Sequence, residues 1–284
     1  MKKYFFLTIF VGKSILFQAQ NGLEKIIVEK YYISSKSDTA ANCYAGELPI
    51  GSVTYRIFTD LLPGYRFQAA YGSSKHELKI STSTTFFNNE EIGNVIPNVI
   101  PRRNLKKNTT MLDSWLSVGT AGENYYGILK QDDDSVENIQ NEIGFLKSIN
   151  KKAGIPIFEK DGLISGENIP RPTFFGIDSA VIVFNNKSSG SIFCIHNGAW
   201  ACLGKGSVGA DSLTNNRVLI AQITTDGEFE FELNLQIGTP VGTSENYVAR
   251  NPTGKEISIP SLIYNSSKKK KLKRVNNRKS LLTK

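Results

Sequence analysis

Residues 216–237 read NRVLIAQITTDGEFEFELNLQI, and they carry the clearest folding pattern in the chain. Apolar residues alternate strictly through the second half of this stretch, at Phe229, Phe231, Leu233, Leu235 and Ile237. A period of two is typical of a β-strand, because successive side chains point to opposite faces of the sheet. The dipeptide Asp226-Gly227 favours a tight type I′ turn, so we predict a β-hairpin over these residues.

The intervening positions of this stretch are polar and are predicted to face solvent: Glu228, Glu230, Glu232, Asn234 and Gln236. Three carboxylates along one face of a strand resemble the layout of some sandwich-fold glycosidases, since α-carbons two residues apart lie roughly 6–7 Å apart. A solvated strand or a protected sheet edge shows the same pattern. We therefore treat Glu228, Glu230 and Glu232 as candidate binding residues and assign no catalytic residue.

Other stretches rich in β-branched, aromatic or alternating residues predict more strands, at residues 23–33, 53–60, 65–71, 77–85, 111–118, 125–130, 174–184, 191–195, 199–203 and 256–264. One helix is predicted at residues 132–150, where apolar residues recur at spacings of three and four. Many short strands separated by turn signals indicate an all-β protein. We predict a single antiparallel, jelly-roll-like β-sandwich domain over residues 20–264, with a β-barrel as the alternative.

The N-terminus has the features of a secretory signal peptide over residues 1–19. Lys2 and Lys3 precede an apolar run at residues 4–11, and Ala19 precedes a plausible cleavage point. The run is too short to cross a bilayer, and no other stretch approaches the roughly 18 apolar residues of a membrane-spanning helix. We expect an exported protein without a transmembrane segment, extracellular or at the cell surface, with the periplasm as the alternative.

The positive charge of the chain is concentrated at its C-terminus. The formal net charge is +8, but residues 268–284 contain nine Lys or Arg and no acid. We predict a basic disordered tail at residues 265–284 that can contact an anionic surface through clustered lysines. The tail has no aromatic residue to stack on bases, so we expect no specific nucleic-acid partner.

The cysteines are Cys43, Cys194 and Cys202. Cys194 and Cys202 flank a predicted hairpin turn at Asn197-Gly198. A two-residue turn would place the two thiols on opposite sides of the sheet. A bulge or a longer loop would bring them into register and allow a disulfide.

Motifs for cofactors, metals and catalysis are incomplete. Residues 204–209 match G-x-G-x-x-G, but a polar loop follows where a dinucleotide-binding helix should begin. The acids at residues 132–134 lack EF-hand spacing, and the histidines, His76 and His196, lie far apart in the sequence. We therefore expect no cofactor and no metal site. Aromatic side chains offer one further signal, because exposed rings stack on sugars, and Trp115 and Trp200 are the candidates.

Several segments resemble a family of exported proteins from Bacteroidota-type bacteria that are often predicted cargo of the type IX secretion system. These segments are residues 48–72, 82–93, 112–119, 160–166 and 216–239. The resemblance implies export, and it carries no established activity or site residue. Family members often end in a C-terminal sorting domain, whereas only the basic tail follows Tyr264 here.

These observations favour an exported, non-enzymatic binding or adhesion protein whose partner is a cell-surface or extracellular polysaccharide. The alternative is a glycoside hydrolase that uses Glu230 and Glu232. A third interpretation is a structural component of a matrix or surface layer that binds no small ligand.

Overall fold

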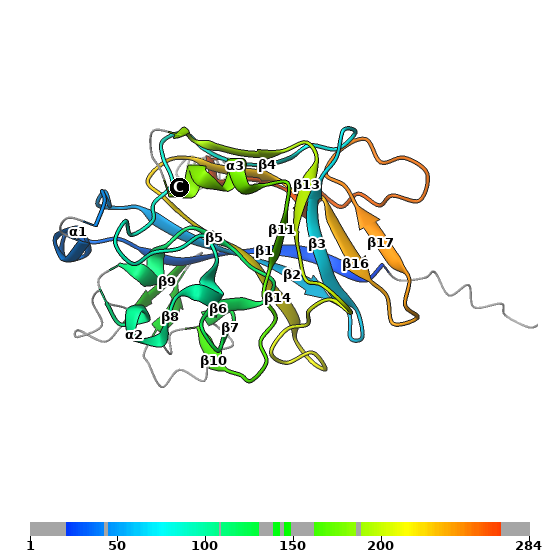
Figure 1. The fold of residues 1–284 in the computed structure, drawn as a ribbon, viewed down its shortest axis with the longest axis horizontal. Helices are drawn as coiled ribbons and strands as arrows, with labels where there is room; N and C mark the ends of the chain where they lie inside the picture. Colours follow the sequence, from blue (N-terminus) through cyan, green and yellow to red (C-terminus); the bar gives the residue numbers. More distant parts are fainter. Residues whose placement is uncertain are drawn as a thin grey trace, which may run out of the picture.

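The computed structural model describes residues 21–42, 45–107, 109–130, 139–142, 145–148, 162–185 and 189–267. These residues form mostly antiparallel β-sheets, which confirms the predicted all-β sandwich class (Figure 1). No sheet among these ranges closes into a barrel. The predicted signal peptide and residues 268–284 of the predicted tail lie outside the described residues, as does Cys43.

Five sheets are described, and we name them A to E. In strand order, sheet A contains β1 (Leu23–Ile33), β2 (Val53–Leu61), β14 (Asn216–Thr225) and β5 (Trp115–Leu116). Sheet B contains β11 (Thr173–Phe175), β13 (Gly198–Ala201), β3 (Arg66–Gly72), β16 (Leu235–Gly238) and β17 (Ser244–Tyr247). Sheet C contains β12 (Ile192–Ile195), β4 (Leu78–Thr82), β15 (Phe229–Glu232) and β18 (Ile263–Asn265).

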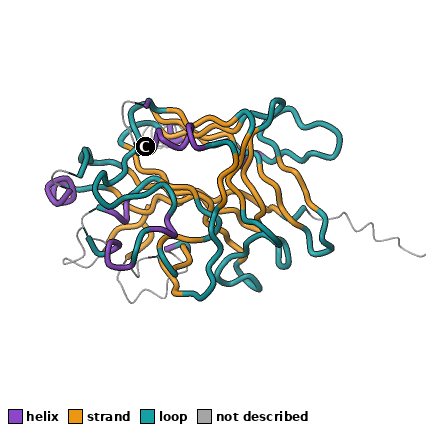
Figure 2. Tube along the Cα trace, in the orientation of Figure 1, coloured by secondary structure: helices purple, strands orange, loops and turns teal. Residues whose placement is uncertain are grey.

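The smaller sheets are D, with β10 (Leu163–Ser165), β7 (Tyr125–Gly127) and β6 (Thr120–Gly122), and E, with β8 (Ile139–Glu142) and β9 (Phe145–Ser148). The helices are α1 (Lys36–Asn42), α2 (Arg102–Leu105) and α3 (Asp178–Val181), and 3-10 turns occupy Pro97–Val99, Thr110–Leu112, Ile182–Phe184 and Pro260–Leu262. Figure 2 shows that these helical segments are short and lie in the connections between strands. None of the helices in the described ranges is long and apolar enough to span a membrane.

Sheet A lies in the middle of the molecule, with sheet C on one side and sheet D on the other (Figure 1). Tyr55 and Ile57 of β2 face a large core that they share with side chains of sheets B and C, including Trp200 and Phe229. Phe58, on the opposite side of β2, belongs to a second core that also contains Trp115. The predicted alternation of β2 is therefore present, but both of its faces are buried.

The predicted hairpins at Asn197-Gly198 and at residues 216–237 are wrong, because their strands belong to different sheets. Strands β12 and β13 lie in sheets C and B, and β14 and β15 lie in sheets A and C. Gly227 fits tightly where the chain crosses between sheets A and C, because a Cβ there would come within 2.4 Å of Thr82 Oγ1. The Thr82 and Thr225 hydroxyls lie 2.6 Å apart, so this crossing is held by side chains rather than by a hairpin ladder.

Sheets B and C meet at a corner through which three neighbouring segments of the chain pass. The order β13-β3-β16 in sheet B is repeated as β12-β4-β15 in sheet C, so each segment bends from one sheet into the other. Gly72 is required here, because a Cβ at this position would lie 1.9 Å from the Ile195 carbonyl oxygen. The chain bends at this corner, so the alternating apolar residues of 229–237 belong to two strands, β15 and β16, rather than to one.

Asn234 occupies this corner and is buried, contrary to its predicted place on the solvent face. Its Nδ2 donates hydrogen bonds to the carbonyl oxygens of Tyr71, His76 and Glu77, at 3.2, 3.0 and 3.0 Å. Its Oδ1 accepts a hydrogen bond from the Ala249 amide at 3.0 Å. The side chain therefore satisfies backbone groups that the bend removes from the sheet ladders.

The predicted helix at residues 132–150 is wrong for the part that the structure describes. Residues 139–142 and 145–148 form the antiparallel pair β8 and β9, with Ile139 opposite Ser148. Short apolar runs fit either period, and Gly144 disfavours a helix. The reverse error occurs at residues 174–184, where α3 and a 3-10 turn replace most of the predicted strand.

Candidate functional site

Strand β15 places Glu230 and Glu232 on the outer face of sheet C. Phe229 and Phe231 are buried, whereas Glu230 is exposed and Glu232 is partly exposed. This confirms the predicted alternation, and Glu228, just before the strand, is exposed as well. The strand register aligns Ser81, Glu230 and Asn265 in one row and Lys79, Glu232 and Ile263 in the next.

Both carboxylates have polar partners from other elements. Arg250 donates from Nε and Nη2 to the two oxygens of Glu232, with both distances at 2.7 Å. These hydrogen bonds and the positive charge of Arg250 lower the pKa of Glu232, which keeps its carboxylate ionised. Glu230 accepts a hydrogen bond from Asn265 Nδ2. The result is a row of fixed, planar hydrogen-bonding groups.

These residues line a surface pocket of about 110 Å³, which we call the sheet C pocket. Its lining consists of Lys79, Ser81, Glu230, Phe231, Glu232, Arg250, Ile263, Tyr264 and Asn265. The two aromatic residues in this set, Phe231 and Tyr264, stack on each other with ring centroids 5.4 Å apart. Tyr264 also packs against the buried core, so the pocket is defined mainly by polar side chains.

Neither predicted tryptophan platform is available to a ligand. Trp115 is 1 % exposed in the second core, and Trp200 is fully buried in the large core. The Trp200 indole donates to the Ile220 carbonyl oxygen at 3.2 Å, next to the bulge in β14. Their burial removes both residues from the candidate binding set, because a stacking platform needs an open ring face.

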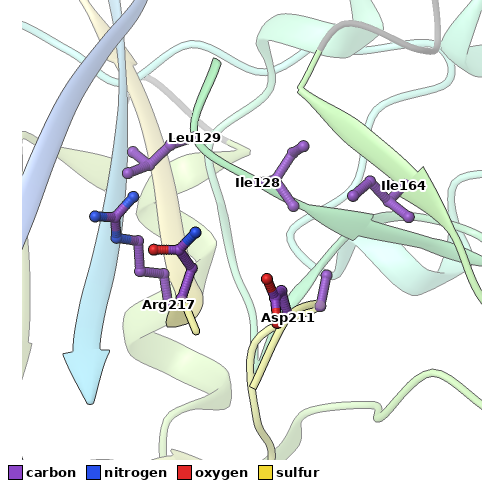
Figure 3. Close-up of a pocket in the computed structure, with 7 residues that line it drawn as sticks. Ile128, Leu129, Ile164, Asp211 and Arg217 are labelled. Carbon is purple, nitrogen blue, oxygen red and sulfur yellow. The ribbon is translucent and has the colours of Figure 1, made fainter. Parts of the chain in front are cut away.

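A second pocket of about 180 Å³ lies between the start of β14 and the segments around β7 and β10 (Figure 3). Ile128 and Ile164 form its apolar side, and Asp211 and Arg217 lie across from them. Arg217 Nε lies 3.5 Å from Asp60 Oδ1. The Thr214 hydroxyl donates to Asp211, and this hydrogen bond lowers the pKa of Asp211. Although this pocket is larger, it contains none of the predicted binding residues, and its charged groups are engaged in local structure.

Cys194 and Cys202 are both free thiols, so the disulfide considered from the sequence is not formed. Cys194 Sγ instead lies 3.3 Å from His196 Nε2, and His196 Nδ1 lies 3.5 Å from Glu77 Oε2. Burial, followed by the hydrogen bond to Glu77 and its charge, raises the pKa of the Cys194 thiol to about 11. A thiol that stays protonated at neutral pH is a poor nucleophile, so this Cys-His-Glu order does not indicate covalent catalysis.

Sequence reasoning missed Arg250 and Asn265 in the sheet C pocket, and Glu77 and Cys194 beside His196. His196 is exposed, and the sequence analysis did not identify its neighbours. The Cys-x-His spacing could have predicted that Cys194 and His196 lie close together, since residues two apart in an extended segment share a face. Its acidic partner becomes evident only from the pairing of β12 with β4.

Turns rather than a helix follow the glycine-rich loop at residues 204–209 and lead into β14, as the polar sequence there predicts. Ser207 forms an antiparallel bridge with Phe67, and a Cβ at Gly206 would lie 2.7 Å from the Phe67 carbonyl oxygen. The glycine at 206 thus serves close backbone packing. Comparisons of the chain with protein-family models, with curated proteins and with solved structures found no match.

Proposed function

We propose that this chain is an exported, non-enzymatic binding or adhesion protein that contacts glycan through the sheet C pocket. The observation that carries the proposal is the row of fixed polar groups on the outer face of sheet C. Glu232 is held by Arg250 through two hydrogen bonds, and Glu230 is held by Asn265. Planar carboxylate, amide and guanidinium groups in fixed positions match the paired hydroxyl groups of a sugar, because each can form two hydrogen bonds.

The arrangement favours binding over glycoside hydrolysis. A retaining glycosidase needs one carboxylate that is free to attack the sugar and one carboxylic acid with a raised pKa. Both oxygens of Glu232 are already bonded to Arg250, and the pKa of Glu232 is lowered. These features support a role for Glu232 as an anchored hydrogen-bond acceptor.

A glycan array probed with the full chain tests the proposal. Variants are measured on the same array, so that any binding of the basic C-terminus to acidic glycans is equal in all of them. Glu230→Gln and Asn265→Ala are expected to weaken binding to a captured glycan at least about tenfold, since each removes a polar contact from a specific site. Glu228→Gln is the matched control, because Glu228 is exposed on the same segment but does not line the pocket.

Three outcomes would contradict this proposal. Equal binding by all variants would place recognition elsewhere, and a blank array with self-assembly would favour the structural interpretation. Release of sugar from a bound glycan, lost in Glu230→Gln, would favour the hydrolase.

A further inference from the structure

Three side chains that can ligate a metal converge at the end of sheet C near its corner with sheet B. Cys194 lies in β12 and His196 follows directly after this strand, and both point away from the core, because Phe193 and Ile195 are the buried residues here. In the register of β12 with β4, Cys194 lies opposite Lys79 and Ile195 opposite Leu78. Glu77 directly precedes β4 and His196 directly follows β12, and His196 Nδ1 lies 3.5 Å from Glu77 Oε2.

The separations suit a shared ion. One ligand atom from each of Glu77, Cys194 and His196 lies within 4.8 Å of the other two, and Cys194 Sγ lies 3.3 Å from His196 Nε2. Two atoms bound to one tetrahedral zinc ion at about 2.0 and 2.3 Å lie roughly 3.5 Å from each other. Cys194 is nearest to Nε2 of His196 and Glu77 is nearest to Nδ1, so the exposed His196 side chain must rotate to place one ring nitrogen beside both other ligand atoms around one ion.

The chemistry of the three donors selects the metal. A thiolate, which forms when the metal displaces the thiol proton to solvent, and an imidazole are ligands of zinc and other borderline or soft metals, whereas calcium and magnesium prefer oxygen atoms alone. We propose that Glu77, Cys194 and His196 form a zinc-binding site with three protein ligands and a fourth position open to water or an external ligand. None of these three residues lines the sheet C pocket, so the proposal stands independently of glycan binding.

The surroundings allow an ion to enter without opening the fold. The side chains of His196 and Glu77 are 71 % and 47 % exposed, and Cys194 is partly exposed. Lys79 is the charged group paired across the strands with Cys194, and its positive charge acts on the thiol. This lysine opposes a bound cation, so its removal is expected to tighten zinc binding.

The test uses the full chain, reduced and free of metal, titrated with Co²⁺ and then with Zn²⁺. A thiolate-to-cobalt absorption band is expected at one ion per chain, and Zn²⁺ should displace it. Cys194→Ser should abolish the band, and His196→Ala and Glu77→Gln should each weaken Zn²⁺ binding at least about tenfold. Cys202→Ser is the matched control, because Cys202 is also a partly buried free thiol and should leave the band unchanged.

A second readout is thermal stability, since an ion that binds the folded state raises the melting temperature. Zn²⁺ should raise the melting temperature of the wild type and of Lys79→Gln but not that of Cys194→Ser. The proposal is overturned if no ion binds, or if Cys194→Ser and the wild type bind Zn²⁺ equally. It is also overturned if the ion is lost in His76→Ala and kept in His196→Ala, which would assign it to the His76 and Glu256 pair.

Discussion

Strands β2 and β15 both alternate polar with apolar residues, but the polar side chains of β2 are buried whereas those of β15 face solvent. In β15, Glu230 reaches solvent on the outer face of sheet C. In β2, Arg56 is fully buried between sheet A and the second core. Its Nε donates to Gln222 Oε1 at 2.9 Å, its Nη1 donates to the Gly162 carbonyl oxygen at 3.0 Å, and its Cζ lies 3.7 Å from the centre of the Tyr31 ring.

This difference arises from the number of layers that cover each sheet. Sheet A has a core on both of its faces, so the polar side chains of β2 and β14 must find partners inside the protein. Within the described ranges, sheet C has a core on one face only, and its other face carries the sheet C pocket and the Glu77, Cys194 and His196 cluster. The polar side chains of β2 therefore form hydrogen bonds that stabilise the fold, whereas those of β15 form a candidate binding surface.

Replacing Arg56 with alanine should produce the largest effect, because this side chain bonds only to groups inside the protein. The change leaves Gln222 Oε1 without the Arg56 donor, removes one of two donors from the Gly162 carbonyl oxygen, which still accepts from the Ile128 amide, and creates a cavity. We expect the free energy of unfolding in urea to fall by about 3 kcal/mol or more. Glu230→Ala, the matched change in β15, should alter it by no more than about 0.5 kcal/mol. Similar losses for the two variants would refute the distinction between the strands.

Asn234→Ala tests a buried polar side chain at the corner where sheet B passes into sheet C. The change removes three donated hydrogen bonds and one accepted hydrogen bond from buried backbone groups. The expected loss in the free energy of unfolding is about 2–3 kcal/mol, measured by the same urea titration. Gln236→Ala, in the next strand and partly exposed, is the control and should cost less than about 1 kcal/mol. A neutral Asn234→Ala would show that the corner does not depend on this side chain.

The smallest expected effect is the pH dependence of the stability that the Glu232 carboxylate contributes on the outer face of sheet C. Arg250 lowers the pKa of Glu232 below the ordinary value of 4.5, so the ionised carboxylate stabilises the folded state above the unfolded pKa. This contribution should be lost as the pH falls through the lower, folded pKa. The stability difference between the wild type and Glu232→Gln should therefore be constant near neutral pH and shrink in acid, and high salt should reduce it. A difference that grows as the pH falls would contradict this assignment.

Local strand positions were largely predictable from the sequence. The predicted strands at residues 23–33 and 53–60 correspond closely to β1 and β2, and the buried side of β15 is the predicted one. Turn signals were less informative. Asp226-Gly227 and Asn197-Gly198 suit hairpins, but in this fold they accompany crossings between sheets, where glycine is needed for close packing. The end of β18 at Asn265 also extends one residue past the predicted domain boundary.

The candidate site was predictable only in part. The outward direction of Glu230 and Glu232 follows from alternation, whereas their partners Arg250 and Asn265 come from segments whose pairing cannot be read from the chain. The same holds for Glu77 beside Cys194 and His196. Trp115 and Trp200 show the opposite error, because an aromatic residue in a strand suits a core as well as a binding surface.

Where the chain is extended and which side chains share one side of a strand can be predicted from the residues alone, because both depend on the pleat of a single strand. The pairing of the strands, their bends between sheets and the covering of their faces by a second layer are set by the packing of the whole fold. Those outcomes depend on contacts between residues far apart in the chain, whose combined burial must outweigh the entropy of bringing them together. For that reason Arg56 and Glu230 look equivalent in the sequence and occupy opposite environments in the fold.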